Sequence, residues 1–381
     1  MIREKLRTLV KEYSERNKRN NCSAVYSVTN SHGFMSSTDY FSKEVFSKDL
    51  STYKIVRRGM IAYNPSRINV GSVAVQRAKE TVIVSPLYVV FSVDENKILP
   101  EFLTYFLHSD TGLQQIAAHT SGSVRDSLKF GALQDIEINL YSIEEQREII
   151  AKLQKVDDLL ECQRTVLKRL DDLVKSQFIE MFGHPQINEK GYPLLTVEDV
   201  IEFQGGSQPD KSYFEYEKTE NNVRLIQIRD YKTDKFLTYI PKNLVRRYCY
   251  PDDIMIGRYG PPIFQILQGI EGAFNVALMK ATPKRGNREF VRYFLKQDCL
   301  LHYLEGLSKR TAGQDGIQMD KLKKYPFPYP PIELQNQFAA FVEQTDKSKV
   351  LMERCIFLVN TLRKVEKTKG ICYNIASKEV V

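Results

Sequence analysis

The sequence lacks several features that would assign it to a common class of protein. It has no apolar run of the roughly 18 residues that a membrane span needs, and its N-terminal segment is polar and charged, unlike a secretory signal. The six cysteines form no CxxC pair, so neither a disulfide framework nor a zinc site is indicated. The five histidines show no metal-ligand spacing. We therefore expect a cytoplasmic protein with reduced thiols and no bound metal.

Catalytic motifs are missing as well. A methyltransferase acting on a base amino group would need a glycine-rich cofactor loop and a tetrapeptide of the Asn-Pro-Pro-Tyr kind, and the nearest string is Asn64-Pro65-Ser66. No acidic-x-Lys triplet of a nuclease follows Pro209-Asp210 at short range, and the Gly-Lys-Ser/Thr phosphate loop does not occur. These absences predict a non-catalytic recognition or scaffold component that binds no cofactor itself.

What the chain does contain is an internal repeat. The segment EFLTYFLHSD at 101–110 returns as EFVRYFLKQD at 289–298, and IEEQ at 143–146 returns as IELQ at 332–335. The two copies are separated by nearly the same distance in sequence in both pairs, 188 residues in the first and 189 in the second. The protein is therefore predicted to consist of two similar halves, each a domain-sized block followed by a helical block.

The helical blocks carry a heptad-like apolar pattern. In residues 143–182 apolar side chains recur in steps of four and three, and Gly183 supplies a stop. The copy at 332–369 has a less regular seam and a wider apolar face, as expected if it packs against both its sister helix and another protein. A single amphipathic helix cannot bury its stripe alone, so the two are predicted to form an antiparallel coiled coil.

The blocks at 1–142 and 183–331 are predicted to be mixed α/β (α+β) domains. The first is expected to open with a charged helix, and residues 370–381 form a polar tail. Alternating segments predict strands in the first block at 53–56, 60–63, 72–76 and 82–92, and in the second at 223–228, 236–240, 253–258, 263–267 and 274–280. In each block the repeated helix leads through a glycine-containing loop to a last strand, at 136–140 and 325–329.

Charge is informative once it is divided among these blocks. The net charge of +8 splits into +4 for residues 1–142, −2 for 143–182, +4 for 183–331 and +2 for 332–381. The excess therefore lies chiefly in the two globular blocks. Matched basic domains favour a polyanionic partner, although a solvated surface explains so modest an excess almost as well.

Several strings together resemble the specificity subunit of type I DNA restriction-modification systems. They are DDIMIGRYGPP at 252–262, EGAFNVALMK at 271–280, FIEMFGHP at 178–185 and the IExQ helix after each domain. The resemblance covers nearly the whole chain, including its duplication. It implies two target-recognition domains, each reading one half of a bipartite and asymmetric double-stranded DNA site, and two helices that set the spacing and dock the partner subunits.

The resemblance also implies the partners. The specificity subunit has no activity of its own. It places two adenine-N6 methyltransferase subunits, which use S-adenosylmethionine, and two restriction subunits that translocate DNA with ATP and Mg²⁺. A purely structural adaptor with protein-binding domains is the alternative, and salt-sensitive duplex binding would count against it.

We expect DNA contacts where polar side chains follow or line predicted strands and glycine loops. The alternative is a turn that closes the sheet for Arg258 and Tyr259, and a solvent-facing side chain for the strand residues. If segment 22–33 takes the place of the strand around Gln227, then Ser27, Thr29 and Asn30 join them. The predicted contacts are Arg67, Gln76, Arg77, Lys79, Ser123, Arg125, Gln227, Arg229, Arg258, Tyr259, Lys309, Arg310 and Gln314. The bases recognised and the spacer length in base pairs do not follow from the sequence.

Overall fold

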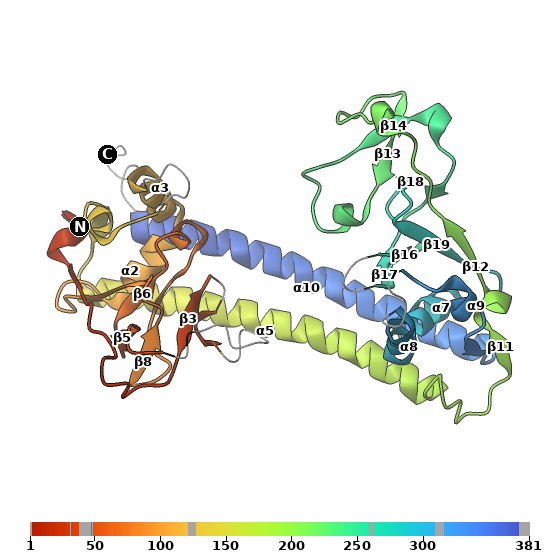
Figure 1. Cartoon of the computed structure of the whole chain (residues 1–381), viewed down its shortest axis with the longest axis horizontal. Coiled ribbons are helices and arrows are strands. Elements are labelled where there is room, and N and C mark those ends of the chain that lie inside the picture. The colour runs from red at the N-terminus through yellow and green to blue at the C-terminus, as the bar shows by residue number, and fades with distance from the viewer. Residues whose placement is uncertain are drawn as a thin grey trace, which may run out of the picture. The chain divides into compact units, whose positions relative to one another are not determined.

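The computed structural model describes residues 2–30, 32–37, 47, 49–120, 127–259, 263–308 and 316–372. The chain divides into two compact units (Figure 1). Unit 1 comprises Met1–Arg164 with Glu353–Val381, and unit 2 comprises Thr165–Met352. These differ from the predicted domains, because each long helix begins in one unit and ends in the other.

Unit 1 is built around a four-stranded antiparallel sheet. Its strand order is β2-β9-β6-β7, and a buried cluster that includes Phe91, Phe102 and Phe106 packs the helices against it. The elements of unit 1 before the long helix are β1 (Ile2–Lys5), η1 (Leu6–Thr8), β2 (Val10–Glu12), β3 (Tyr26–Thr29), β4 (Gly33–Ser36), β5 (Lys54–Arg57), β6 (Ile61–Tyr63), η2 (Ile68–Val70), β7 (Val73–Val75), β8 (Thr81–Val84), β9 (Val89–Val93), α2 (Pro100–Leu107), α3 (Asp110–His119), α4 (Phe130–Leu133) and β10 (Glu137–Leu140).

Unit 2 repeats this frame. Its inner sheet has the order β12-β19-β16-β17, again entirely antiparallel. The elements of unit 2 between the long helices are β11 (Leu194–Thr196), α6 (Val197–Val200), β12 (Ile201–Gly205), η3 (Lys211–Tyr213), β13 (Asn222–Ile226), η4 (Ile228–Tyr231), β14 (Tyr239–Pro241), η5 (Lys242–Leu244), β15 (Tyr248–Cys249), β16 (Ile254–Gly257), β17 (Gln265–Gln268), β18 (Gly272–Phe274), β19 (Leu278–Pro283), α7 (Arg288–Leu295), α8 (Asp298–Ser308), α9 (Met319–Lys323) and β20 (Pro326–Pro328).

The outer layers of the two units are built alike. In unit 1 the antiparallel pairs β3-β4 and β5-β8 are joined by a parallel bridge between Val25, next to β3, and Ile83 on β8. In unit 2 four strands join in the order β14-β13-β18-β15, and the β13-β18 pair is parallel. The duplication is therefore preserved in both layers, whereas the connections differ: β3 ends at Thr29 and β4 begins at Gly33, but β13 ends at Ile226 and β14 begins only at Tyr239.

A buried glutamine explains why the IExQ marker recurs. In unit 1 the side chain of Gln146 accepts the backbone N–H of Leu99 at 2.8 Å and donates to the carbonyls of Lys97 and Tyr141, both at 2.9 Å. In unit 2 Gln335 accepts the N–H of Asn287 and donates to the carbonyl of Pro330, both at 2.8 Å. Each glutamine thus fastens the start of a long helix to the residue before the repeated EF-YFL helix, and both are fully buried.

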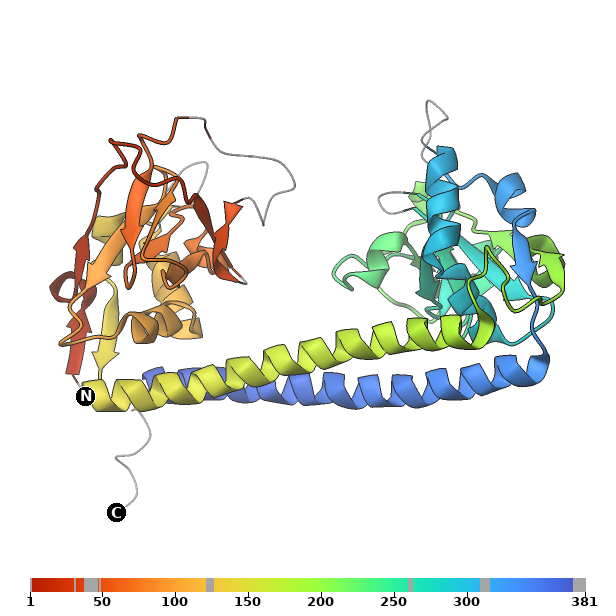
Figure 2. The same cartoon turned by 90° about the horizontal axis from the view of Figure 1, so that it is seen from below.

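The long helices are α5 (Ile143–Phe182) and α10 (Ile332–Cys372), close to the predicted 143–182 and 332–369. Within each unit their segments lie side by side (Figures 1 and 2). In unit 2 Lys349 pairs with Asp171 at 2.7 Å, and further along Phe338 packs edge-on against Phe182. The residue numbers rise along one helix as they fall along the other, so the pairing is antiparallel. In unit 1 the corresponding contact joins Arg363 to Asp157 at 2.7 Å.

Several local predictions were wrong. The predicted strand at 82–92 is two strands, β8 and β9, and the one at 274–280 covers the end of β18 and the start of β19. The N-terminal segment is not a helix, because β1 pairs with β10 over Ile2–Lys5 and β2 pairs with β9, and such ladder pairing overrides helix propensity. The predicted strand through 223–228 ends at Ile226, and η4 follows it. Within the described residues, no helix is both long and apolar enough to cross a membrane.

Candidate nucleic-acid interface

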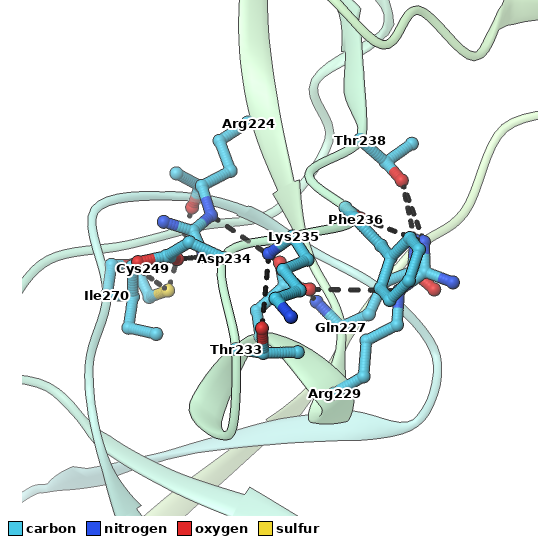
Figure 3. Close-up of polar contacts among 12 residues, drawn as sticks. Arg224, Gln227, Arg229, Thr233, Asp234, Lys235, Phe236, Thr238, Cys249 and Ile270 are labelled. Carbon is cyan, nitrogen blue, oxygen red and sulfur yellow. Dashed lines mark hydrogen bonds and ion pairs between the residues drawn. The ribbon is translucent and has the colours of Figure 1, made fainter. Parts of the chain in front are cut away.

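The loop between η4 and β14 in unit 2 is held by the two residues that were predicted to read DNA (Figure 3). Gln227 donates its side-chain amide to the hydroxyl of Thr238 at 3.1 Å. Arg229 donates to the same hydroxyl at 3.0 Å and to the carbonyl of Phe236 at 3.1 Å. They were expected to share a strand face. Instead both converge on Thr238, because the chain turns at Gln227 into the 3-10 helix.

A second set of contacts fixes the other side of this loop. Arg224 on β13 donates to Asp234 at 3.0 Å and to Asp230 at 3.4 Å. Burial raises the pKa of the Asp230 carboxyl, while the N–H of Gln227 and the charges of Arg224 and Arg229 oppose that rise. The Asp230 side chain is only 1% exposed, so it serves as an anchor beneath the two arginines.

An exposed aromatic pair lies on this loop surface and was not predicted from the sequence. Phe236 is 63% exposed and Tyr216 is 73% exposed. Both line a shallow pocket of about 410 Å³ together with Arg229 and Lys235. The sequence hid this feature because Phe236 lies in an alternating segment that favours a half-buried strand. Exposed apolar rings beside cations are typical of a binding surface rather than a packed core.

Arg258 and Tyr259 lie beyond the end of β16, as predicted. The Arg258 guanidinium sits 5.3 Å from the centre of the Tyr259 ring, and Tyr259 pairs with Gly316 through an isolated bridge. The ring is nearly half exposed. In unit 1 Tyr63, at the end of β6, is fully buried and donates its hydroxyl to the carbonyl of Leu128 at 3.1 Å.

In unit 1 the prediction for Gln76 is wrong. Its side chain is fully buried and donates to the carbonyl of Lys79 at 2.7 Å. A side chain without accessible surface cannot contact DNA, so Gln76 shapes the turn before β8. Arg77 is half exposed and makes a two-nitrogen contact with Glu101, at 2.8 and 2.6 Å. Arg67 and Lys79 are exposed.

The hairpin residues proposed for unit 1 have mixed environments. Ser27 lies on β3 with its hydroxyl 3.2 Å from that of Ser37. Thr29 is buried, and its hydroxyl donates to the carbonyl of Gly33 at 3.2 Å and accepts the N–H of His32 at 3.0 Å. That hydroxyl closes the β3-β4 turn and is not accessible, so the prediction for Thr29 is wrong. Asn30 at the turn is exposed.

The predicted contacts in the glycine loops lie outside the described residues. They are Ser123, Arg125, Lys309, Arg310 and Gln314.

A basic loop in unit 1 was not among the predicted contacts. Arg16, Lys18 and Arg19 are all exposed and line a surface pocket of about 630 Å³. Between them Asn17 is buried. Its amide donates to the carbonyl of Cys22 at 2.8 Å and its oxygen accepts the N–H of Cys22 at 3.2 Å, which closes the loop. The run of cations was a usable sequence signal, but it fell within the segment predicted to be helical.

No group of three or more His, Cys, Asp or Glu side chains in the described part of the chain could hold a metal ion. The interface features are instead cations, amides and exposed rings on loops that buried polar side chains fix. Two copies of one frame with such loops define a duplicated protein of the nucleic-acid-binding class.

Comparison with known proteins identifies the family. The model of the type I restriction modification DNA specificity domain matches twice, over residues 7–171 and 189–356. The chain therefore belongs to this family. Its role is DNA sequence specificity in a restriction-modification system, and it is the non-catalytic subunit that works with enzyme subunits.

Solved structures agree on the fold. A chain from a study titled "Structural basis underlying complex assembly and conformational transition of the type I R-M system" is 19% identical, with 97% of each chain covered and a TM-score of 0.60. The S subunit of a type I restriction-modification system from M. genitalium is 14% identical, with 98% of this chain and 96% of that chain covered and a TM-score of 0.55.

Proposed function

We propose that each recognition domain reads one half of a bipartite, asymmetric DNA site. The observation that carries this proposal is a shared strand frame whose matched strands, such as β3-β4 and β13-β14, are joined by different loops. A shared frame presents its loops in equivalent positions, and different loops present different side chains to base edges. The two half-sites should therefore differ in sequence.

The long helices supply the spacing in this proposal. Helices α5 and α10 contain 40 and 41 residues, which corresponds to about 60 Å at 1.5 Å per residue. That length exceeds one turn of DNA, about 34–36 Å, so contacts on adjacent turns of the duplex are within reach.

Phosphate contacts would come from loops outside the base-reading surface. The basic loop of unit 1 is the best candidate, because Asn17 holds the backbone while Arg16, Lys18 and Arg19 remain exposed. Such contacts position the protein on the duplex and carry no sequence information.

The partners we propose are two adenine-N6 methyltransferase subunits and the restriction subunits that translocate DNA. S-adenosylmethionine, ATP and Mg²⁺ would be bound by those subunits, in the cytoplasm where the DNA lies. The long helices offer docking surfaces. In unit 1 Phe357 is 71% exposed, and in unit 2 Leu351 lies on a groove of about 1440 Å³ between α10 and the start of α7. Large exposed apolar side chains on a helix favour a protein partner.

Co-expression tests the proposal. The chain would be expressed with an adenine-N6 methyltransferase subunit in a host without DNA methylation, and N6-methyladenine would be mapped across the genome. A split, asymmetric motif that disappears without this chain is expected. Replacing residues 183–331 with the corresponding domain of a relative should change one half-site only. Co-purification without new methylation would favour the adaptor alternative.

A further inference from the structure

The loop Thr233–Thr238 in unit 2 is braced from both sides, and the ring of Phe236 on it is 63% exposed. Arg224 holds Asp234, Arg229 holds the carbonyl of Phe236, and both Gln227 and Arg229 hold Thr238 (Figure 3). The loop is also closed on itself, because the N–H of Lys235 donates to the Thr233 hydroxyl at 3.2 Å. Its conformation is therefore set before any ligand arrives.

These contacts use the side chains that seemed suited to read bases. An arginine that donates to a carbonyl and a hydroxyl of its own loop has fewer N–H groups free for a guanine, and Arg224 is engaged by two carboxylates. Phe236 and Lys235 are exposed on this loop and, within the described part of the chain, their side chains make no contact that braces it, whereas Arg229 is exposed but committed to the loop. The structure thus distinguishes side chains that position the loop from the ring that the loop presents.

An exposed ring at this place has an evident use in a DNA-specificity domain. Apolar side chains, phenylalanine among them, recognise the C5-methyl group of thymine in the major groove, which is wide enough to admit secondary structure. The neighbouring lysine can reach a phosphate, and Asp234 is neutralised by Arg224, so it does not repel the backbone. Preorganisation lowers the entropy cost of ordering such a loop on binding.

We propose that Phe236 is a specificity-determining residue that contacts a thymine methyl group in the half-site read by unit 2, with Arg224 and Arg229 as positioning residues. This inference rests on the proposed function. It differs from the expectation from sequence, in which Gln227 and Arg229 themselves were the readers. A site of adenine methylation necessarily contains A·T pairs, so a thymine is available for this contact.

The test uses the full chain in complex with its methyltransferase subunit and duplexes that contain the mapped site. Each thymine is replaced in turn by deoxyuridine, which lacks the C5-methyl group and keeps the same hydrogen-bonding groups. For the wild-type complex one replacement in one half-site should weaken binding about fourfold, the value of about 0.8 kcal/mol for one buried methyl-sized group. Phe236→Ala should weaken binding to the thymine duplex by about tenfold and should no longer distinguish thymine from deoxyuridine there.

Two further variants keep the test falsifiable. Arg229→Lys should reduce discrimination at that same base pair only, because the loop is then less firmly held. Leu194→Ala removes an apolar side chain that is 60% exposed on β11, and it should leave discrimination unchanged.

Several outcomes would overturn the inference. If Phe236→Ala kept the thymine preference at every position, or if only Arg229→Lys lost it, the ring would not be the reader. If Phe236→Ala weakened binding while no deoxyuridine replacement mattered, the methyl contact would be wrong. These results leave the proposed function intact, whereas a wild-type complex without any split site would overturn both.

Discussion

The strands of the two units are alike, and the loops between them are not. The inner sheets share one strand order and fully antiparallel pairing, and each is tied to a long helix by a buried glutamine. The outer strands also share order and direction, but β13 and β14 are joined by η4 and the Thr233–Thr238 loop, whereas β4 follows β3 after a tight turn. Buried frame residues are constrained by all their neighbours, whereas exposed loops are constrained only by what they bind. The difference teaches that the loops can change while the strand frame stays.

The largest expected effect comes from removing the glutamine clamps. Gln146→Leu leaves the N–H of Leu99 and two carbonyls without a partner, so unit 1 should lose about 3 kcal/mol of stability. Gln335→Leu removes two such hydrogen bonds, so unit 2 should lose about 2 kcal/mol. Hydrogen exchange of the backbone amides would measure both. Each variant is the control for the other, because each substitution should speed exchange only in its own unit. Faster exchange in both units after one substitution would show that the two glutamines do not act independently.

A second prediction concerns the basic loop, whose counterpart after β12 in unit 2, Gly206–Tyr213, contains a single cation, Lys211. Replacing Arg16, Lys18 and Arg19 by glutamine should lower the slope of log affinity against log salt by about 3 and weaken binding uniformly across sequences. Titrations of duplex DNA at several salt concentrations provide the measurement.

The matched control removes the same number of charges from unit 1. Arg3 and Arg7 each lie within 2.6 Å of a carboxylate of β10 or of the turn before it, and Lys5 within 3.9 Å. Replacing these three by glutamine should change the slope much less. Equal slopes in the two triple variants would show that only the net charge of the protein matters. A changed methylation motif in the basic-loop variant would show that this loop reads bases.

A smaller effect is expected at the ion pairs between the long helices. Lys349 in unit 2 contacts Asp171 and Asp346; burial lowers its pKa, but hydrogen bonds to both carboxylates outweigh this, so the net shift is upward. Because the pKa is higher in the folded protein, the stabilisation is complete below the unfolded value near 10.5 and is lost as pH rises through the folded value.

Lys349→Met should therefore lower the stability of unit 2 by about 1 kcal/mol at pH 7, and the difference from wild type should shrink in strongly alkaline solution. Chemical denaturation followed at pH 7 and above pH 10 measures it. Lys347→Met, which removes an exposed intrahelical pair with Glu343, is the control and should change little. A constant difference at both pH values would show that the charge of Lys349 is not what stabilises the helices.

The smallest effect is chemical rather than energetic. Burial raises the pKa of the Cys249 thiol on β15 to about 11, whereas Cys162 and Cys355 on the helix segments are exposed. Since the thiolate is the reactive form, iodoacetamide at pH 8 should modify Cys249 at least about 100-fold more slowly than the two helix thiols. Mass spectrometry of peptides reports each rate, with the unfolded protein as the control. Rapid labelling of Cys249 would mean that the outer sheet of unit 2 opens readily.

The amino-acid sequence by itself determined the periodic and repeated parts of this protein. The heptad-like spacing predicted both long helices to within three residues, since one face must be apolar every 3.5 to 3.6 positions. The marker pairs predicted two related domains, because buried residues such as Phe102 and Phe290 cannot drift without loss of packing. The family resemblance was confirmed over most of the chain.

Only the tertiary structure decided which polar residues are available for binding. Gln76 and Gln227 look alike in sequence, yet one is fully buried and the other holds a loop. The N-terminal segment became two strands because partners 79 or more residues away supply its hydrogen bonds. Exposure and long-range pairing depend on contacts between distant segments, and local patterns do not encode them. For that reason the sequence does not single out Phe236, whereas the tertiary structure makes its ring a candidate base contact by exposing it on a braced loop.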